Sequence, residues 1–437
     1  MSGFQDGDAP DESQLLNCMR CGMCLPSCPT FQLTGRERSS PRGRIALMRA
    51  VHEGALDLED PTFEQEMSDC LGCMACVSAC PAGVQYGDLL EAARDQLQRK
   101  RVEELPWWRN ALERAAFLPF ERLSLLRWSG WTLMLYQRSG LAALVERSGL
   151  LKLLPFNLGK LYGLLPQLPR RFSRQNIPPV SEPVGAQKMV VGFPLGCVMD
   201  VMLAKENEAT ARVLARNGCQ VHAPRESGCC GALHAHAGRL ETARVLARQM
   251  IDSFDGTEYD AIAVNSAGCG NCMKGYGHLL HDDPAYAQKA AEFASKVKDV
   301  SELLLTLEFE KPSRPLPCSV TYHDACHLAH GQGVRVPPRQ VCRTVGTSYT
   351  ELPMSDRCCG SAGTYNVTHF DTSMELLEKK IDEIESTGAD LVGVANPGCL
   401  LQIQYGLRQR GSKTRAEHPV VFLDEAYREA EKVRELE

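Results

Sequence analysis

The sequence lacks the features that mark secreted, membrane-spanning and nucleic-acid-binding proteins. Residues 1–14, MSGFQDGDAPDESQ, are acidic and polar and have neither the basic nor the apolar region of a signal peptide. No run approaches about 18 uncharged apolar residues, so we expect no helix that spans a membrane. A net charge of −6 over 437 residues is mild, and nucleic acid is not an expected partner. These absences predict a cytoplasmic protein, and its length allows two or three domains.

Signatures of organic redox cofactors are absent too. No Gly-x-Gly-x-x-Gly motif follows a predicted strand, and there is no P-loop. We therefore expect neither FAD nor NAD in this chain. Because hydride abstraction needs an organic cofactor, we do not expect the isolated chain to carry out that step.

Cysteine, by contrast, is abundant, with 20 residues in the chain. Disulfide scaffolds occur mostly in short secreted proteins, and this chain is neither short nor visibly secreted. The cysteine content therefore predicts metal ligation.

Two cysteine runs near the N-terminus share one spacing, Cys-x2-Cys-x2-Cys-x3-Cys-Pro. This is the spacing of bacterial ferredoxins, in which the last cysteine of each run binds the cluster of the other run. Zinc sites instead use two separated Cys-x2-Cys pairs. We therefore predict two cubane [4Fe–4S] clusters with crossed ligands. The first is assigned Cys18, Cys21, Cys24 and Cys80, and the second is assigned Cys70, Cys73, Cys76 and Cys28.

A helix is predicted between the two runs. Ser40-Pro41 has the form of a helix start, and apolar residues from Ile45 to Val51 give an approximate buried face. Two interpretations stay open for Arg42 and Arg44. Their side chains lie near the anionic clusters or grip a partner, or they belong to an ordinary solvated first turn.

The segment 101–174 differs in composition from the rest. It holds all four tryptophans, ten aromatic residues in total, and twelve Lys or Arg against five Glu. Pro and Gly divide it into predicted short amphipathic helices. Such helices pack on other protein surfaces or lie in a membrane interface, and both interpretations stay open, including contact with quinone. The stretch RRFSRQNIPPVSEPVG at 170–185 is predicted to be an extended linker.

From about residue 186 the pattern becomes α/β and repeats once. Predicted strands in MVVGFPLGC, YDAIAVNSAGC, CSVTYHDAC and ADLVGVANPGC each end at a cysteine. The cysteines of the first unit return in the second at a nearly constant offset, Cys197 as Cys326, Cys229 as Cys358, and Cys269 as Cys399. This repeat predicts two similar α/β domains with sites at the carboxyl ends of their strands.

Adjacent cysteines such as Cys229 and Cys230 do not chelate one small tetrahedral ion comfortably, but they suit two irons of one cluster. The glycines beside them, Gly228 and Gly231, are expected to let the backbone approach a bulky cofactor. The spacing resembles the CCG domains of heterodisulfide reductase-type proteins. That resemblance implies a [4Fe–4S] cluster, noncubane where five cysteines are present, bound in the first unit by Cys197, Cys229, Cys230, Cys269 and Cys272.

The second unit departs from this pattern because Gln402 stands where the fifth cysteine is expected. The remaining candidate ligands are Cys326, Cys358, Cys359 and Cys399. They suffice for a cubane cluster, or they mark a degenerate site. His323 and His327 flank Cys326. Ligation or hydrogen bonding at the site is one interpretation, and a structural role, which we favour for isolated histidines, is the other. A buried vicinal dithiol and a catalytic redox pair are the other interpretations, and Cys219 and Cys342 are expected to be structural.

The whole chain resembles the family of iron–sulfur subunits of glycolate oxidase, through SPRGRIALM, ESGCCGA, SAGCG and RCCGSAGTYN. The resemblance implies FAD-binding partner subunits that oxidise glycolate, and electron relay through the clusters to a quinone or another acceptor. It also implies a place in the cytoplasm or on the inner face of the cell membrane. Iron–sulfur subunits of glycerol-3-phosphate and D-lactate dehydrogenases share the module order, and a heterodisulfide reductase-like thiol–disulfide enzyme is a further alternative.

The expected fold class is α+β with several domains. We predict a helical ferredoxin-type domain at 1–100 that holds two clusters, and a basic, Trp-rich helical segment with its linker at 101–185. A first CCG domain follows at 186–315, and a second at 316–437.

Overall fold

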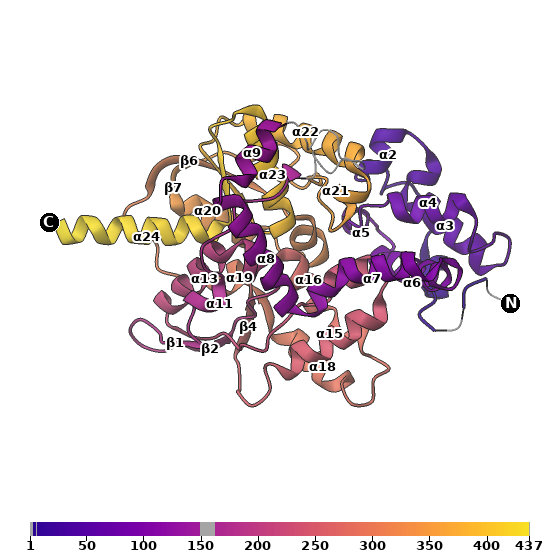
Figure 1. Cartoon of the computed structure of the whole chain (residues 1–437), viewed down its shortest axis with the longest axis horizontal. Coiled ribbons are helices and arrows are strands. Elements are labelled where there is room, and N and C mark those ends of the chain that lie inside the picture. Colours follow the sequence, from indigo (N-terminus) through magenta and orange to yellow (C-terminus); the bar gives the residue numbers. More distant parts are fainter. Residues whose placement is uncertain (1–2, 6, 149–161, 437) are drawn as a thin grey trace.

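A computed structural model describes residues 3–5, 7–148 and 162–436 of the chain. Figure 1 shows a helical N-terminal part on one side, a body built on two sheets, and a helical segment that runs from the first to the second across the front. The expected fold class, a helical ferredoxin-like part followed by a helical segment and two α/β units, is confirmed.

The N-terminal part consists of short helices around a core of its own. They are α1 (Glu12–Asn17), α2 (Pro29–Thr34), η1 (Glu37–Ser39), α3 (Pro41–His52), α4 (Pro61–Asp69), α5 (Ala75–Ser78) and α6 (Tyr86–Glu104). Helix α3 begins as predicted, since the Ser40 hydroxyl accepts a hydrogen bond from the Gly43 amide. Ile45, Met48 and Val51 are buried on its inner face.

The helical segment forms α7 (Trp107–Glu121), α8 (Leu123–Arg138), α9 (Leu141–Ser148) and α11 (Ser173–Asn176). These elements match the predicted short helices, and residues 149–161 of that prediction lie outside the described residues. Within the part of the chain that the structure describes, no helix combines the length and the apolar character needed to cross a bilayer. The predicted linker at 170–185 is not simply extended. It contains α11 and β1 (Val180–Ser181), which pairs antiparallel with an otherwise open sheet edge.

The first CCG unit carries a sheet in the order β1-β3-β2-β4-β5. Its strands after β1 are β2 (Met189–Gly192), β3 (Cys219–His222), β4 (Ala261–Val264) and β5 (Val297–Asp299). Its helices are α12 (Val198–Met202), α13 (Ala204–Arg216), α14 (Ala232–His236), α15 (Leu240–Asp252), α16 (Ala267–Lys274), α17 (Tyr276–Leu279), α18 (Ala287–Lys296) and α19 (Val300–Thr306). Apart from β1, neighbouring strands are parallel.

The second unit repeats this topology with the parallel order β7-β6-β8-β9. Its strands are β6 (Leu316–His323), β7 (Gly346–Tyr349), β8 (Leu391–Val394) and β9 (Arg415–Glu417). Its helices are η3 (His327–Gly331), α20 (Val336–Val345), α21 (Tyr365–Thr368), α22 (Phe370–Ser386), α23 (Pro397–Arg410) and α24 (Pro419–Leu436). Because β3-β2-β4-β5 and β7-β6-β8-β9 follow one order, the repeat of the cysteines in the sequence corresponds to a structural repeat.

The strands end earlier than predicted, so the cysteines do not lie at the strand ends. Strand β2 ends at Gly192, well before Cys197, and Cys269 and Cys399 lie in the first turns of α16 and α23. The cysteines therefore sit just beyond the carboxyl edge of each sheet rather than on the strands, which is where parallel sheets place ligands.

One continuous buried cluster joins the two CCG units. It contains Val191 and Val221 from the first sheet and Val320 and Val392 from the second. Helix α24 of the second unit packs on α13 of the first, where Arg212 pairs with Asp424 at 2.8 Å. The units are thus repeats that share a core.

Candidate metal centres

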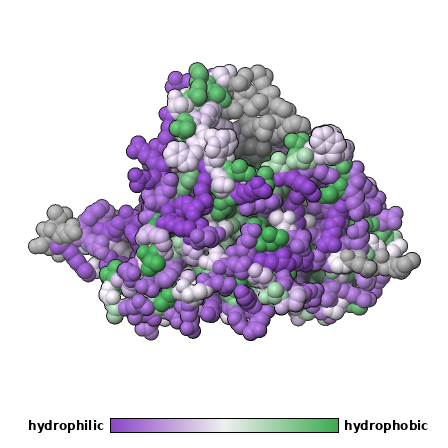
Figure 2. Space-filling model, turned by 60° about the horizontal axis from the view of Figure 1, so that its bottom comes forward, coloured by the Kyte–Doolittle hydropathy of each residue, from purple (hydrophilic) through white to green (hydrophobic). Residues whose placement is uncertain are grey.

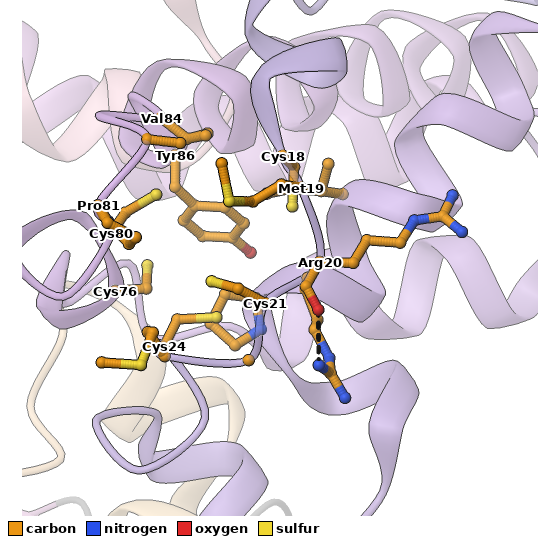
Figure 3. A pocket seen from close by; sticks show the side chains of 16 residues that line it. Cys18, Met19, Arg20, Cys21, Cys24, Cys76, Cys80, Pro81, Val84 and Tyr86 are labelled. Carbon is orange, nitrogen blue, oxygen red and sulfur yellow. Dashed lines mark hydrogen bonds between the residues drawn. The ribbon is translucent and has the colours of Figure 1, made fainter.

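The first predicted ligand set lines one pocket in the N-terminal part. Cys18, Cys21 and Cys24 come from the loop between α1 and α2, and Cys80 comes from the loop after α5. Figure 3 shows their sulfur atoms around a common space beside the Tyr86 ring. Cys76, assigned to the second set, lines the same pocket, so the two sets are adjacent.

The second set, Cys70, Cys73, Cys76 and Cys28, surrounds a more deeply buried place. Burial and the neighbouring thiols Cys70 and Cys28 raise the pKa of Cys76 well above its usual range. Burial also acts on Cys70, but the charges of Arg44 and Arg94 outweigh it and lower the pKa of that thiol. Crowded buried thiols of this kind fit a bound cation, because coordination deprotonates thiols outright.

Arg44 lies beside this second set, as one of the two interpretations from the sequence has it. It is fully buried, pairs with Glu66 at 3.3 Å, and donates from Nε to the Glu66 carbonyl at 2.6 Å. Arg42, in contrast, remains at the surface, paired with Glu37 and donating to the Arg20 carbonyl at 2.9 Å in the cysteine loop. The solvated interpretation therefore fails for Arg44, whose charge lies next to the thiols.

In the first CCG unit, all five predicted ligands converge from separate segments. The Cys197 and Cys229 sulfurs lie 3.7 Å apart, and Cys230 is in contact with both Cys269 and Cys272. Hydrogen bonds from Cys197 and Cys230 lower the pKa of Cys229 well below its usual range. Five thiols around a vicinal pair match the donor set that an iron–sulfur cluster requires.

The glycines that follow the Cys-Cys pairs, Gly231 and Gly360, are required by the local fold. Gly231 has a φ of 88°, and a Cβ there would lie 3.1 Å from the Ala243 carbonyl oxygen. Gly360 has a φ of 86° and faces the Ser373 carbonyl in the same way. Helix packing and the positive φ therefore already require glycine at position 231, and the approach of the backbone to a cofactor stays a prediction.

In the second CCG unit, Cys326, Cys358, Cys359 and Cys399 also come together. Cys326 contacts Cys358, Cys358 contacts Cys359, and Cys359 contacts Cys399 through their thiols. The Asn396 amide lies 3.6 Å from the Cys399 sulfur and donates toward it. The four thiols fit a cluster by the same donor chemistry as in the first unit.

His323, interpreted from the sequence as structural, lies among these thiols. One of its ring nitrogens and the sulfurs of Cys359 and Cys399 all lie within 4.8 Å of one another. Burial, together with the nearby Lys380 charge, lowers the pKa of His323 well below its usual range. Gln402 is buried and does not join them, since it donates to the Ser373 hydroxyl at 2.9 Å. In sequence, nothing but its place three residues before Cys326 signals that His323 belongs to the site.

The remaining cysteines lie outside these sites. Cys219 and Cys342 are buried in the core as expected, and burial raises the pKa of Cys219 to about 12. Cys318 lies on β6, where burial raises the pKa of its thiol and its charged neighbours are Asp390 and Arg415.

The second N-terminal site packs directly against the second CCG unit. Cys73 and Leu71 share a buried cluster with Cys358 and Tyr365. His327, next to Cys326, lies 3.1 Å through Nε2 from the Gly72 carbonyl. Two candidate centres are therefore in contact across the boundary between parts of the chain that are far apart in sequence.

The first CCG site lies against the helical segment. Cys197 packs with Leu126 of α8 and with Phe172. His234 contacts the Cys229 thiol and lies 3.4 Å from the Glu121 carboxylate of α7. The helical segment thus covers the first site.

Comparison with protein-family models assigns every part of this arrangement. A 4Fe-4S dicluster domain matches residues 14–84, and a cysteine-rich domain matches residues 191–274 and again 320–404. Residues 108–165 match the linker region of the glycolate oxidase iron–sulfur subunit. Fold, cysteine sites and these matches define an iron–sulfur protein that serves as a subunit of an oxidoreductase complex.

The similar proteins narrow this class. A probable glycolate oxidase iron–sulfur subunit of Bacillus subtilis is 42% identical over 95% of both chains, and the Escherichia coli glycolate oxidase iron–sulfur subunit is 33% identical over 89% of both. Lactate utilization protein A of Bacillus subtilis is 31% identical over 53% of this chain and 97% of its own. The chain belongs to the family of glycolate oxidase iron–sulfur subunits.

Proposed function

We propose that this chain relays electrons through four iron–sulfur clusters, from FAD-binding subunits that oxidise glycolate to glyoxylate to a further acceptor. The carrying observation is that Cys73 packs against the buried cluster that contains Cys358, which brings the second N-terminal site and the second CCG site close together. One-electron relay needs centres that lie close to one another. The chain supplies ligands, burial and local charge, which set the potentials of the clusters.

The proposed ligands follow the four sets of thiols. Two cubane clusters would use Cys18, Cys21, Cys24 and Cys80, and Cys70, Cys73, Cys76 and Cys28. The first CCG site would use Cys197, Cys229, Cys230, Cys269 and Cys272, and the second Cys326, Cys358, Cys359 and Cys399. The grouping of these thiols into four buried or half-buried sites supports the assignment.

Anaerobic iron and acid-labile sulfide analysis with EPR tests the number of clusters. We expect about sixteen irons per chain, since each of the four sites would hold about four. About eight irons would confine the clusters to the N-terminal part, and colourless or zinc-loaded protein would overturn the proposal.

A substitution tests the relay. Cys73→Ser in the assembled complex should slow reduction of the acceptor by glycolate at least tenfold, while flavin reduction by glycolate is retained. Cys342→Ser, which alters a buried thiol outside the four sites, is the matched control and should leave the rate unchanged. Unchanged acceptor reduction in Cys73→Ser would exclude a relay through this site.

The substrate is proposed from the relatives that cover nearly the whole chain, which are named for glycolate oxidase. Addition of glycolate, D-lactate or glycerol 3-phosphate to the assembled complex, with EPR of the clusters, distinguishes the alternatives. We expect glycolate to reduce the clusters most rapidly. Disulfide turnover by the isolated chain would instead favour the heterodisulfide reductase-like alternative.

We further propose that α7, α8 and α9 form the docking surface for the FAD-binding subunits. Large apolar side chains are exposed there, with Trp107 at 81% and Trp128 at 69% exposure. Figure 2 shows hydrophobic and weakly hydrophilic side chains gathered on a protruding part of the surface. The surplus of Lys and Arg in 101–174 suits an acidic partner surface.

Trp107→Ser with Trp128→Ser should abolish co-purification with the FAD-binding subunits. Val245→Ser, at an exposed apolar residue of α15, is the control that should retain it. Retained co-purification, together with loss of binding to vesicles of anionic lipid, would assign the surface to the inner face of the membrane instead.

A further inference from the structure

The second CCG site lacks one cysteine of the five-cysteine pattern, and a histidine lies where its thiols converge. His323 ends strand β6, and its side chain is fully buried, with an exposed fraction of 0%. One ring nitrogen lies within 4.8 Å of the sulfurs of both Cys359 and Cys399. That spacing gathers the three donors around one place that iron of a cluster can occupy, since iron–nitrogen and iron–sulfur bonds are about 2.0–2.3 Å long, as they are for zinc.

The two ring nitrogens of His323 have no hydrogen-bond partner among the described residues. Neither ring nitrogen makes a hydrogen bond of ordinary geometry, and the approach to the Ser355 backbone falls outside that geometry. A buried polar atom without a partner costs about 1–3 kcal/mol. A ligand for one nitrogen removes that cost, while the Ser355 backbone is placed to orient the other, as metal-bound histidines usually require.

Gln402, which replaces the fifth cysteine, is already occupied. Its Nε2 donates to the Ser373 hydroxyl at 2.9 Å, and its Oε1 accepts from Asn366 at 3.2 Å. Both partners are part of the second unit, so the amide is fixed by hydrogen bonds rather than offered to the site. The position left by the missing cysteine is not taken up by the residue that replaced it.

The first unit shows the converse arrangement. The offset that relates Cys197 to Cys326 places Pro194 opposite His323. The offset that relates Cys269 to Cys399 places Cys272 opposite Gln402. Proline has no donor for a metal, and Cys272 supplies a thiol. Each unit therefore has five candidate donors, and the second has exchanged one thiol for an imidazole at a different place in the sequence.

We propose that His323 binds iron in the second CCG site as its fifth protein ligand. This rests on the proposed function, because it requires a cluster at Cys326, Cys358, Cys359 and Cys399. A neutral imidazole in place of a thiolate removes one negative charge from the ligand set, and substitution of histidine for cysteine raises cluster potentials. The second site therefore accepts electrons more readily than the first.

Pulsed EPR of the reduced, anaerobically purified complex tests this directly. The complex is prepared with natural-abundance histidine and with 15N-histidine. We expect a strongly coupled nitrogen whose signal changes with the label in the wild-type protein. We expect that signal to vanish in His323→Cys, which returns a thiol to the site, while the iron content stays within about a tenth of wild type.

The neighbouring histidine supplies the control. His327→Gln changes a half-buried histidine adjacent to Cys326 and should retain the label-dependent coupling. Absence of the coupling in the wild type, or its persistence in His323→Cys, would overturn the assignment, and the wild-type measurement decides even where a variant fails to fold. Cys359→Ser tests the histidine ligand and the cluster separately. Loss of about four irons with no histidine coupling rejects only the ligand, whereas no loss of iron rejects the cluster itself.

Discussion

The two CCG units share a strand order, a core and the positions of four cysteines, yet their sites have different surroundings. The first site has five thiols and is covered by α7 and α8. The second has four thiols with His323 and faces the N-terminal site that contains Cys73. The comparison teaches that the duplicated scaffold fixes where the thiols converge, while the residues packed against each site decide which other part of the chain that site faces.

The two CCG units also differ in buried charge near their thiols. Lys380 is fully buried in the second unit, donates to the Met354 carbonyl at 2.7 Å, and pairs with Glu383 at 2.6 Å. Met250 occupies the corresponding place in the first unit, as QMID aligns with KKID. At this place the second unit therefore has a buried cation close to its thiols, and the first has an uncharged side chain.

Removing one cysteine of each vicinal pair should have the largest effect. Cys230→Ser and Cys359→Ser each take away a ligand shared by the convergent thiols, and we expect each to lose about four irons per chain. Iron and acid-labile sulfide analysis of the anaerobic complex measures this. Cys219→Ser, a buried thiol of the first unit outside both sites, should keep its iron. A full iron content in only one of the two variants would show that the two units do not bind iron in the same way.

Exchanging the fifth donor should affect the units unequally. Cys272→Gln gives the first unit the residue of the second, and Pro194 offers no replacement, so we expect iron loss to a chelator to accelerate at least about tenfold. Gln402→Cys in the second unit should leave the rate nearly unchanged, because His323 already serves there. Equal chelation rates in both variants would show that the two sites do not differ in their donors.

Charge at the second site should produce a smaller change. Lys380→Met introduces the side chain found in the first unit and removes a buried positive charge. The reduction potential of the second site should fall on the order of 50 mV, as expected for a unit charge about 10 Å away at an effective dielectric of about 20. EPR-monitored redox titration measures it. Lys379→Met, an exposed neighbour on α22 paired with Glu375, should leave the potential in place.

The smallest expected effect is on the pH dependence of stability, and it comes from a buried histidine that lies outside the four cysteine sites. His418 lies beside Val300 and Val341, where the two units meet, and burial lowers its pKa to about 3 from an ordinary 6.5. Below pH 6.5 the unfolded chain therefore gains a proton that the folded chain refuses, and stability falls as the pH drops toward 3.

His418→Gln removes this dependence, which amounts to at most about 1.4 kcal/mol per pH unit. Between pH 7 and pH 5.5, the melting temperature of the wild type should fall about 2 °C more than that of the variant. Parallel declines would show that His418 does not titrate between the folded and unfolded states.

The sequence predicted most of the scaffold because its signals are local. Short stretches of sequence carry these signals: the fixed cysteine spacings, the Ser40-Pro41 helix start, and the order of strands and cysteines in each unit. Each signal corresponds to a feature of the structure. Gly218, which follows α13, has a φ of 89°, a conformation that favours glycine. These features need no knowledge of what packs against them.

The parts that escaped prediction depend on contacts between distant segments. The sequence leaves two interpretations of Arg44 open, and only its burial against Glu66 decides between them. His323 is an isolated histidine in the sequence, and the cysteines near it, Cys359 and Cys399, come from other elements. The strand at Val180 forms because β3 leaves an edge open. The spacing of nearby residues predicts neither the burial of a charged side chain nor the pairing of a short strand with the edge of a sheet.

Helix α24 carries a consequence for the order of synthesis. It belongs to the second unit, but it covers α13 of the first, with Arg212 on Asp424 and the Tyr427 hydroxyl on the Glu310 carbonyl (Figure 1). On the ribosome, the outer face of the first unit stays bare until residues 419–436 have emerged. The core that the two units share therefore cannot close over α13 before α24 is present.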